Sequence, residues 1–388
     1  MRTGKMNHPM FLRHGRTMTS ATRSRIPPML SWTNVVPVLS LLALLLTWGR
    51  ETGPILVTVV ALMLAGSVLA AVHHAEVVAH RVGEPFGSLV LAVAVTIIEV
   101  ALIVTLMISG GPEAATLARD TVFAAVMITT NGIIGLSLLR GALKYQVVPF
   151  NAEGSGAALA TVTTLAVLSM VVPTFTTGAA GPEFTTPQLV FAALASLALY
   201  GMFVFAQTVK HRDFFLPVDM EDEAPVDSND EHAPPPSNRE AWTSLGLLLV
   251  ALVAVVGLAK VESPAIEAGV ASLGLPQSFV GVVIALLVLL PETLAAVRAA
   301  GRGRVQISLN LGYGSAMASI GLTVPVIALA TIWLDGPLML GLEATQMVLL
   351  AMTVVVSMLT VVPGRATRLQ GGVHLVLLAA FLFLAVNP

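Results

Sequence analysis

The chain contains two apolar stretches with one acid in the middle of each, Leu89-Val-Leu-Ala-Val-Ala-Val-Thr-Ile-Ile-Glu99-Val-Ala-Leu-Ile-Val104 and Val282-Val-Ile-Ala-Leu-Leu-Val-Leu-Leu-Pro-Glu292-Thr-Leu-Ala-Ala-Val297. A charged side chain at the centre of a bilayer costs about 2.5 to 3.5 kcal/mol on insertion scales. Acids in such positions therefore indicate an ion or proton site by default. Glu99 and Glu292 are the first candidate site residues.

The two stretches also repeat each other. Shifting one by 193 positions places Ser88 on Gly281 and Glu99 on Glu292. In membrane proteins built from two related halves, binding sites lie at the interface of the halves. The sequence therefore predicts one site to which each half contributes an acid.

Composition sets the class of protein around these stretches. The chain is 56% hydrophobic and 11% charged, with a mean hydropathy of +0.87, against roughly 25% charged residues in soluble domains. Apolar runs of about 20 residues without polar alternation indicate spanning helices rather than barrel strands. The absence of cysteine excludes disulfides, thiolate metal sites and cysteine nucleophiles. The predicted fold class is therefore an all-α polytopic membrane protein.

Breaks at glycine, proline and charged residues divide the apolar sequence into eleven helices. They are expected at 33–49, 55–75, 86–108, 120–139, 156–173, 189–208, 242–259, 277–297, 307–332, 338–361 and 372–386. With the N-terminus in the cytoplasm, only Arg50, Arg119 and Lys260 among the lysines and arginines fall on the outer side. Because basic residues stay inside, this split predicts cytoplasmic placement of the N-terminus and of the long loop after the sixth helix.

The eleven predicted helices divide the chain into five consecutive segments. Residues 1–30 read as a basic cytoplasmic tail and 31–50 as the first helix, followed by a five-helix repeat over 51–208. An acidic cytoplasmic linker over 209–241 precedes a second five-helix repeat over 242–388. Because five is odd, two halves of the same fold must lie inverted in the membrane. The linker is expected to be disordered, and a role as a calcium sensor or cation antenna is the alternative.

Polar residues follow each acid within the next predicted helix. Residues 120–136 align with residues 306–322 at a shift of 186, and the two segments carry Thr130 and Asn131 in one half and Asn310, Ser315 and Ser319 in the other. Hydroxyl and amide oxygens can replace the water around a hard cation. Small polar residues also hold membrane helices together. For the hydroxyl residues this structural role is the favoured interpretation. For Asn131, which is costlier to bury, a place in the cation site is favoured.

Histidines gather at the cytoplasmic end of the second predicted helix. His73, His74 and His80 lie close in sequence to Glu84, and an intramembrane metalloenzyme is one reading of the cluster. The His-Glu-x-x-His spacing of zinc enzymes is missing from this segment. An interfacial structural role is favoured, with proton entry through His80 and Glu84 as the alternative to it.

The second half carries a resemblance to a known family. It reads Pro291-Glu292-Thr-Leu-Ala-Ala-Val-Arg-Ala-Ala and then Val305-Gln-Ile-Ser-Leu-Asn-Leu-Gly-Tyr-Gly-Ser-Ala-Met-Ala-Ser-Ile-Gly-Leu-Thr-Val-Pro325. With Gly83-Glu-Pro-Phe-Gly-Ser-Leu89 and Asn131-Gly-Ile-Ile-Gly-Leu136, this resembles the cation/calcium exchanger superfamily in its bacterial calcium/proton antiporter branch. The resemblance implies that Glu99 and Glu292 are carboxylates shared by cation and proton.

The expected function is therefore secondary transport and not enzyme catalysis. Burial and mutual repulsion make two nearby carboxylates hold protons until a cation neutralises them, so proton and cation compete for one site. Ca²⁺ exported in exchange for H⁺ by alternating access is the expected reaction, with Na⁺ or K⁺ as alternative cations and an uncoupled cation channel as the rival class. The expected setting is the cell inner membrane. The expected partners are ions and lipids, without cofactor or nucleic acid, and the oligomeric state stays open.

Overall fold

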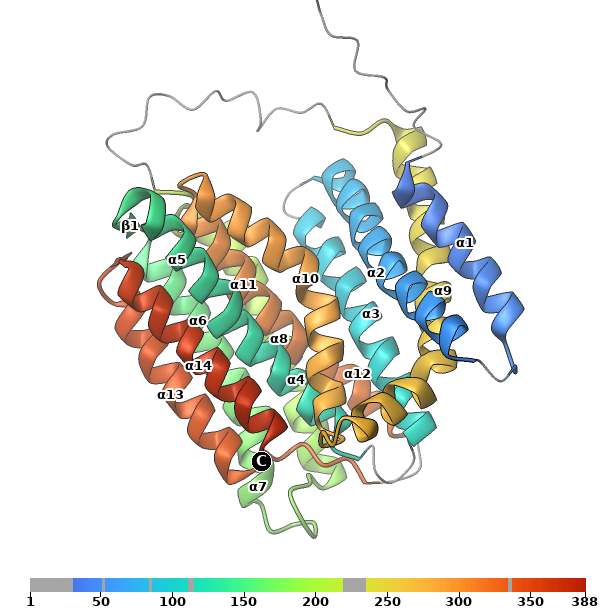
Figure 1. Ribbon diagram of the computed structural model, residues 1–388. Coiled ribbons are helices and arrows are strands. Elements are labelled where there is room, and N and C mark those ends of the chain that lie inside the picture. Colours follow the sequence, from blue (N-terminus) through green and yellow to red (C-terminus); the bar gives the residue numbers. More distant parts are fainter. Residues whose placement is uncertain (1–30, 51–52, 84–85, 111–114, 219–234, 334–336) are drawn as a thin grey trace, which may run out of the picture.

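The computed structural model describes residues 31–50, 53–83, 86–110, 115–218, 235–333 and 337–388. The basic tail, Glu84 and most of the acidic linker lie outside these ranges. Eleven helical stretches are present in the described part (Figure 1). Ten of them are long and apolar enough to cross a membrane, and the first is a shorter apolar helix. The predicted all-α polytopic fold is confirmed.

The first half of the chain contains six of these stretches and one short strand. They are α1 (Trp32–Thr47), α2 (Pro54–Val82), α3 (Phe86–Gly110), α4 (Leu117–Met127) continued by η3 (Ile128–Ile133) and α5 (Ile134–Tyr145), β1 (Val148–Pro149), α6 (Ala152–Ala166) continued by η4 (Val167–Val171) and α7 (Val172–Phe175), and α8 (Thr186–Phe205) continued by η5 (Ala206–Lys210). The short turn η6 (Arg212–Phe215) then leads toward the acidic linker.

The second half contains five stretches. They are α9 (Asn238–Ser272), α10 (Phe279–Gly301), α11 (Val305–Gly321) followed by α12 (Thr323–Ala330), α13 (Ala344–Val361) and α14 (Arg368–Val386), with β2 (Arg365–Ala366) between the last two. Several helices are longer than their apolar cores predict. The largest difference is α9, which was expected to end at 259.

The extension of α9 passes through polar residues and a proline. Glu262 and Ser263 are buried, and the Ser263 hydroxyl donates a hydrogen bond to Glu267 Oε1 at 2.9 Å. Pro264 lies inside the helix and removes one backbone donor. Neighbouring helices cover this part of α9, so the helix continues where hydropathy alone predicts its end.

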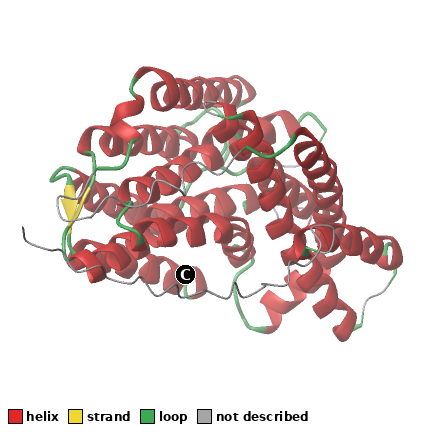
Figure 2. Ribbon diagram, turned by 90° about the horizontal axis from the view of Figure 1, so that it is seen from above, coloured by secondary structure: helices red, strands yellow, loops and turns green. Residues whose placement is uncertain are grey.

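Two opposite faces of the helical body are useful reference points. We call the face where α8 and η5 end and α9 begins the linker side, and the opposite face the far side. Strands β1 and β2 pair antiparallel on the linker side, with Val148 opposite Ala366, and Figure 2 shows this pair at one edge. On the far side, Glu183 and Met339 form a bridge between two loops.

The helices form two groups. Helices α1, α2 and α9 pack together at one flank of the body in Figure 1, with α3 against them. Buried Val68, Ala71, Ala251 and Val255 belong to the apolar core of this flank. The remaining helices share a second and larger core. Both acids therefore lie on helices, α3 and α10, that join the two groups.

Glycines allow the closest helix contacts. A Cβ atom on Gly281 of α10 would lie 2.8 Å from the backbone nitrogen of Thr121 in α4. A Cβ atom on Gly371 of α14 would lie 2.6 Å from the backbone nitrogen of Leu139 in α5. Membrane helices rely on small residues for such backbone approach, and Gly281 brings α10 directly onto α4 near the far side.

Candidate functional site

Glu99 lies in the middle of α3 and is 3% exposed. Its Oε2 accepts a hydrogen bond from the Ser319 hydroxyl of α11 at 2.9 Å. Its Oε1 has no partner among the described residues. Buried polar atoms normally find partners, so this oxygen has free capacity for a proton or a cation.

Glu292 lies in the middle of α10, directly after Pro291. The residue is half-buried, and its Oε2 atom is buried without a partner in the described part of the chain. Proline has no N–H, so the carbonyl of Leu287 loses its usual helical donor. Helix α10 bends in its middle (Figure 1) but stays continuous. Helix α10 is therefore bent and not broken beside Glu292.

A cavity of about 230 Å³ connects the two acids. Glu99, Glu292, Asn310, Ser315 and Ser319 all line it. These residues come from α3, α10 and α11, which are far apart in the sequence. The structure thus brings five of the predicted site residues onto one surface, where two carboxylates, two hydroxyls and an amide face a common space.

The cavity extends from the acids toward the linker side. Leu91 of α3, Gln207 of η5 and Ile307 of α11 line its outer part, and all three lie near the linker-side ends of their helices. On the far side of the acids, Ile103, Ala118 and Ile327 form a buried cluster. The described structure therefore connects the acids to the linker side and packs apolar residues beyond them.

Asn310 lines the cavity, and its side-chain amide makes two hydrogen bonds. Its Nδ2 donates to the Phe215 carbonyl at 2.7 Å, and its Oδ1 accepts from Gln306 Nε2 at 2.9 Å. Asn310 therefore fixes the turn η6 beside the cavity. Its Oδ1 accepts one hydrogen bond and has a second lone pair for a cation, so its role as an ion ligand stays a prediction.

Thr130 and Asn131 lie away from the cavity lining, within η3. Thr130 donates to the Val126 carbonyl of its own helix. Asn131 Nδ2 donates to Thr353 Oγ1 at 2.9 Å, and its Oδ1 accepts from His374 Nδ1 at 3.1 Å. In this conformation Asn131 joins η3 to α13 and α14, and the predicted part of both residues in the cation site stays a prediction.

The histidines of α2 are spread over different surroundings. His74 is buried and its Nε2 contacts the Thr33 carbonyl at 2.9 Å, while His73 and His80 are exposed. Within the described ranges, no three His, Asp or Glu side chains come together in a way that could hold a metal ion. This favours the interfacial reading. Proton entry at His80 stays a prediction, and Glu84 lies outside the described residues.

The sequence reasoning missed part of the cavity wall. The cavity is also lined by residues of α8 and η5, namely Tyr200, Phe203, Val204 and Gln207. The apolar sequence of α8 does not indicate that its residues face a cavity. Thr96 also lines the cavity. It lies three residues before Glu99, a spacing that places both on one helix face, so this residue could have been found.

Two acids on separate helices, one buried and one half-buried, face a cavity that extends toward one side of the helical body. This arrangement fits a carrier for small cations. Comparisons with known proteins agree with this class. Residues 52–209 and 243–387 match the family described as sodium/calcium exchanger protein. The chain belongs to that family and is a transporter.

Relatives cover nearly the whole chain. The protein y4hA of Sinorhizobium fredii is 43% identical over 372 residues, which are 94% of this chain and 98% of the relative. The sodium-potassium/proton antiporter ChaA of Escherichia coli is 36% identical over 351 residues, or 90% and 94% of the two chains. The solved structure of native YfkE shares the fold, with a TM-score of 0.66 at 16% identity, covering 92% of this chain and 99% of that one.

Proposed function

We propose that this protein exchanges a cation for protons by alternating access, with Glu99 and Glu292 as the shared binding groups. One observation carries the proposal. Two acids from helices 193 residues apart in the sequence face one cavity, and each keeps a buried oxygen without a partner among the described residues.

The chemistry follows from the surroundings of the two acids. The cavity wall is largely apolar, so a carboxylate there is stable only when a proton or a cation neutralises its charge. Both ligands need the same oxygens and cannot occupy them together. If the change of open side requires a neutral site, each cation that crosses one way is exchanged for protons that cross the other way.

Ca²⁺ is the cation we propose first. Two carboxylates match its charge, and hydroxyl oxygens from Ser315 and Ser319 belong to the hard ligands that it prefers. Na⁺ or K⁺ is the second candidate, because one acid can stay protonated while the other binds a monovalent ion. The name of the 36% identical relative from Escherichia coli, a sodium-potassium/proton antiporter, supports this second candidate.

The direction of transport follows from the proposed orientation. The distribution of lysine and arginine supports a cytoplasmic linker side in a bacterial inner membrane. The cavity then faces the cytoplasm, ready to accept a cation for export as protons enter. We further propose that the halves 51–208 and 242–388 are the inverted repeats whose relative motion changes the open side, with 209–241 as the cytoplasmic linker between them.

The test is cation-induced proton movement in everted vesicles that carry a pH-sensitive dye. Wild type, Glu99→Gln and Glu292→Gln are compared with added Ca²⁺, Na⁺ or K⁺. We expect a cation-dependent signal that each variant reduces at least about 100-fold, since removal of one of two buried charges costs several kcal/mol. Glu183→Gln, which removes an acid on the far side away from the cavity, is the control and should keep full activity.

Other outcomes would change the proposal in different ways. A response to Na⁺ or K⁺ alone would keep the mechanism and replace the ion. Cation flux without proton movement would reject antiport in favour of a channel. Full activity in both glutamine variants, at normal levels of folded and inserted protein, would show that the binding site lies elsewhere.

A further inference from the structure

Another cavity lies at the edge of the body, between α1 and α9. Its volume is about 330 Å³, which is at the small end of the range of ligand sites, roughly 300 to 1,000 Å³. Its wall consists of the end of α1 with the residues that follow it and of one turn of α9, namely Thr47, Trp48, Gly49, Arg50, Lys260 and Val261. None of these residues lines the central cavity, so the two spaces are separate.

The packing of α1 on α9 explains why the cavity lies at this height. Leu44 lies against Gly257, where the absence of a side chain lets the two helices approach closely. One turn further along both helices, Thr47 and Lys260 line the cavity, and α1 ends there. The cavity is therefore the space beside the last close contact of the two helices.

Hydrogen bonding at the opposite end of this flank shows on which side the cavity lies. Arg81, at the end of α2, donates from Nε to Asn238 Oδ1, at the start of α9, at 2.9 Å. Helix α2 therefore ends on the linker side, and the connection from α1 to α2, where Arg50 lies, is on the far side. Under the proposed orientation this is the outer face of the membrane.

Two basic residues line this cavity on the side where basic residues are disfavoured. Arg50, Lys260 and Arg119 are the basic residues that the sequence places outside. Arg119 is neutralised by ion pairs with Asp120 and Glu343. No acid of the described residues forms an ion pair with Arg50 or Lys260, so both positive charges remain available to a ligand.

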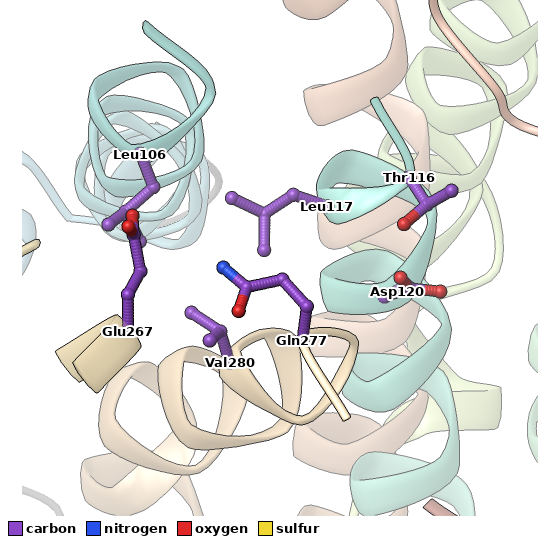
Figure 3. A pocket seen from close by; sticks show the side chains of 7 residues that line it. All are labelled: Leu106, Thr116, Leu117, Asp120, Glu267, Gln277 and Val280. Carbon is purple, nitrogen blue, oxygen red and sulfur yellow. The ribbon is translucent and has the colours of Figure 1, made fainter. Parts of the chain in front are cut away.

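The acids nearest in sequence do not change this balance. Glu262 of α9 is buried. Figure 3 shows the Glu267 side chain turned toward Leu106, in the wall of a separate small cavity of about 10 Å³. Glu51, which follows Arg50, lies outside the described residues and offsets at most one of the two positive charges. The cavity between α1 and α9 therefore keeps a net positive charge and favours an anion.

Trp48 forms an aromatic wall of the cavity. Lys260 Nζ lies 5.3 Å from the centre of the Trp48 ring, which is a cation–π contact. The Trp48 side chain is 55% exposed. Tryptophan and lysine at the end of a spanning segment are typical of the level of the lipid headgroups, so the cavity lies where headgroups meet the protein.

Exposed apolar side chains continue from the cavity toward the membrane centre. Val256 and Val253 lie four and seven residues before Lys260, so they share its helix face, and both are exposed. Leu45, three residues before Trp48 on α1, is 69% exposed. A molecule with a negatively charged headgroup and apolar chains matches this order of basic, aromatic and aliphatic surface.

We propose that Arg50, Lys260 and Trp48 form a binding site for an anionic phospholipid. Its phosphate lies between the two basic side chains, and its acyl chains lie on the apolar faces of α1 and α9. Helix α1 packs on α2 and α9, so a lipid held by Arg50 and Lys260 together ties α1 to this flank. The proposal does not depend on ion exchange, and the proposed orientation decides only the leaflet that supplies the lipid.

The experiment uses Trp48 as the reporter in reconstituted vesicles. Trp32, Trp242 and Trp333 are exposed and are changed to phenylalanine, which leaves Trp48 as the single tryptophan of the four. Brominated acyl chains quench a nearby indole. Vesicles of brominated phosphatidylglycerol with ordinary phosphatidylcholine, and the reverse mixture, therefore compare the two lipids at Trp48. We expect phosphatidylglycerol to bind at least about tenfold more strongly, because two positive charges face its phosphate.

Variants of the two basic residues test whether the preference belongs to this cavity. Arg50→Gln and Lys260→Gln should each reduce it about fivefold, because each removes one positive charge. Lys260→Arg keeps the charge and should keep the preference. In the matched control Trp333 replaces Trp48 as the single tryptophan. Trp333 is exposed and does not line the cavity, so it should show no preference.

Three outcomes would overturn the proposal. Equal quenching of Trp48 by the two lipids would show that no anionic lipid is selected. A preference that survives both Arg50→Gln and Lys260→Gln, or one of equal size at Trp333, would show that this cavity does not cause it. Inorganic phosphate added to the same vesicles should leave the quenching unchanged, and its displacement of brominated phosphatidylglycerol would assign the site to a soluble anion instead of a lipid.

Discussion

The hydrogen bond from Ser319 to Glu99 connects the two halves of the chain at the central cavity. Ser319 was one of several hydroxyl residues for which sequence favoured a structural role, and the structure places it directly on the acid. Asn131, for which sequence favoured the site, instead bonds to Thr353 and His374. Residue type does not settle either position, because only the packing of helices decides which polar side chain faces the acids.

At this scale we expect Ser319→Ala to weaken cation binding at the central site. The hydroxyl stabilises the charged form of Glu99, which is the form that binds a cation, and a hydrogen bond to a charged group contributes about 1.5 kcal/mol or more. The apparent cation affinity in the vesicle assay should therefore fall about tenfold. Ser196→Ala, which removes a buried hydroxyl that hydrogen-bonds to Ser169 away from the cavity lining, should leave the affinity unchanged. An unchanged affinity in Ser319→Ala would show that this hydrogen bond does not support binding.

Helix α10 positions Glu292 through two special residues, Pro291 and Gly281. Proline bends the helix beside the acid, and glycine allows the helix to lie against the backbone of α4. The helix continues through the proline, because a spanning helix keeps its backbone bonded where lipid offers no substitute donors. Similarly, α9 was expected to end near its charged residues, yet tertiary burial of Glu262 lets it continue.

At the scale of the element we expect Gly281→Ala to destabilise the protein. The added Cβ would lie 2.8 Å from the Thr121 nitrogen, and such overpacking costs about 1 to 3 kcal/mol. Thermal unfolding in detergent should show a clearly lower midpoint. Gly246→Ala on α9 is the matched control, since its Cβ meets nothing within 4 Å and alanine favours helix. Equal midpoints for the two variants would contradict the close α4–α10 contact.

The whole molecule connects the central acids to the linker side and packs apolar residues on the far side. This asymmetry arises from how two groups of helices meet, and under the proposed mechanism it corresponds to one state of an alternating carrier. The natural chain has no cysteine, so single introduced cysteines report the accessible side without background. Arg239 on the linker side and Thr177 on the far side are both exposed and mark the two faces.

At this scale we expect Leu311→Cys, in the cavity wall, to react with a membrane-impermeant thiol reagent from the same side as Arg239→Cys. The reason is that the cavity between the described residues extends from the acids toward the linker side. Labelling is compared in intact cells and everted vesicles, with Thr177→Cys as the marker of the other face. Reaction of Leu311→Cys from the Thr177 side alone would show that the protein rests in the opposite state.

The sequence alone determined the class of the protein and the eleven helical stretches of its described part, because charge is costly in lipid and spanning segments are therefore long and apolar. The same cost is why the sequence pointed to Glu99 and Glu292. Only the tertiary structure decided which polar residues share the cavity with those acids, since all the candidates have similar chemistry and lie on helices of similar hydropathy. The same is true of the α8 residues in the cavity wall. These features depend on contacts between segments far apart in the chain, and local sequence carries no record of such contacts.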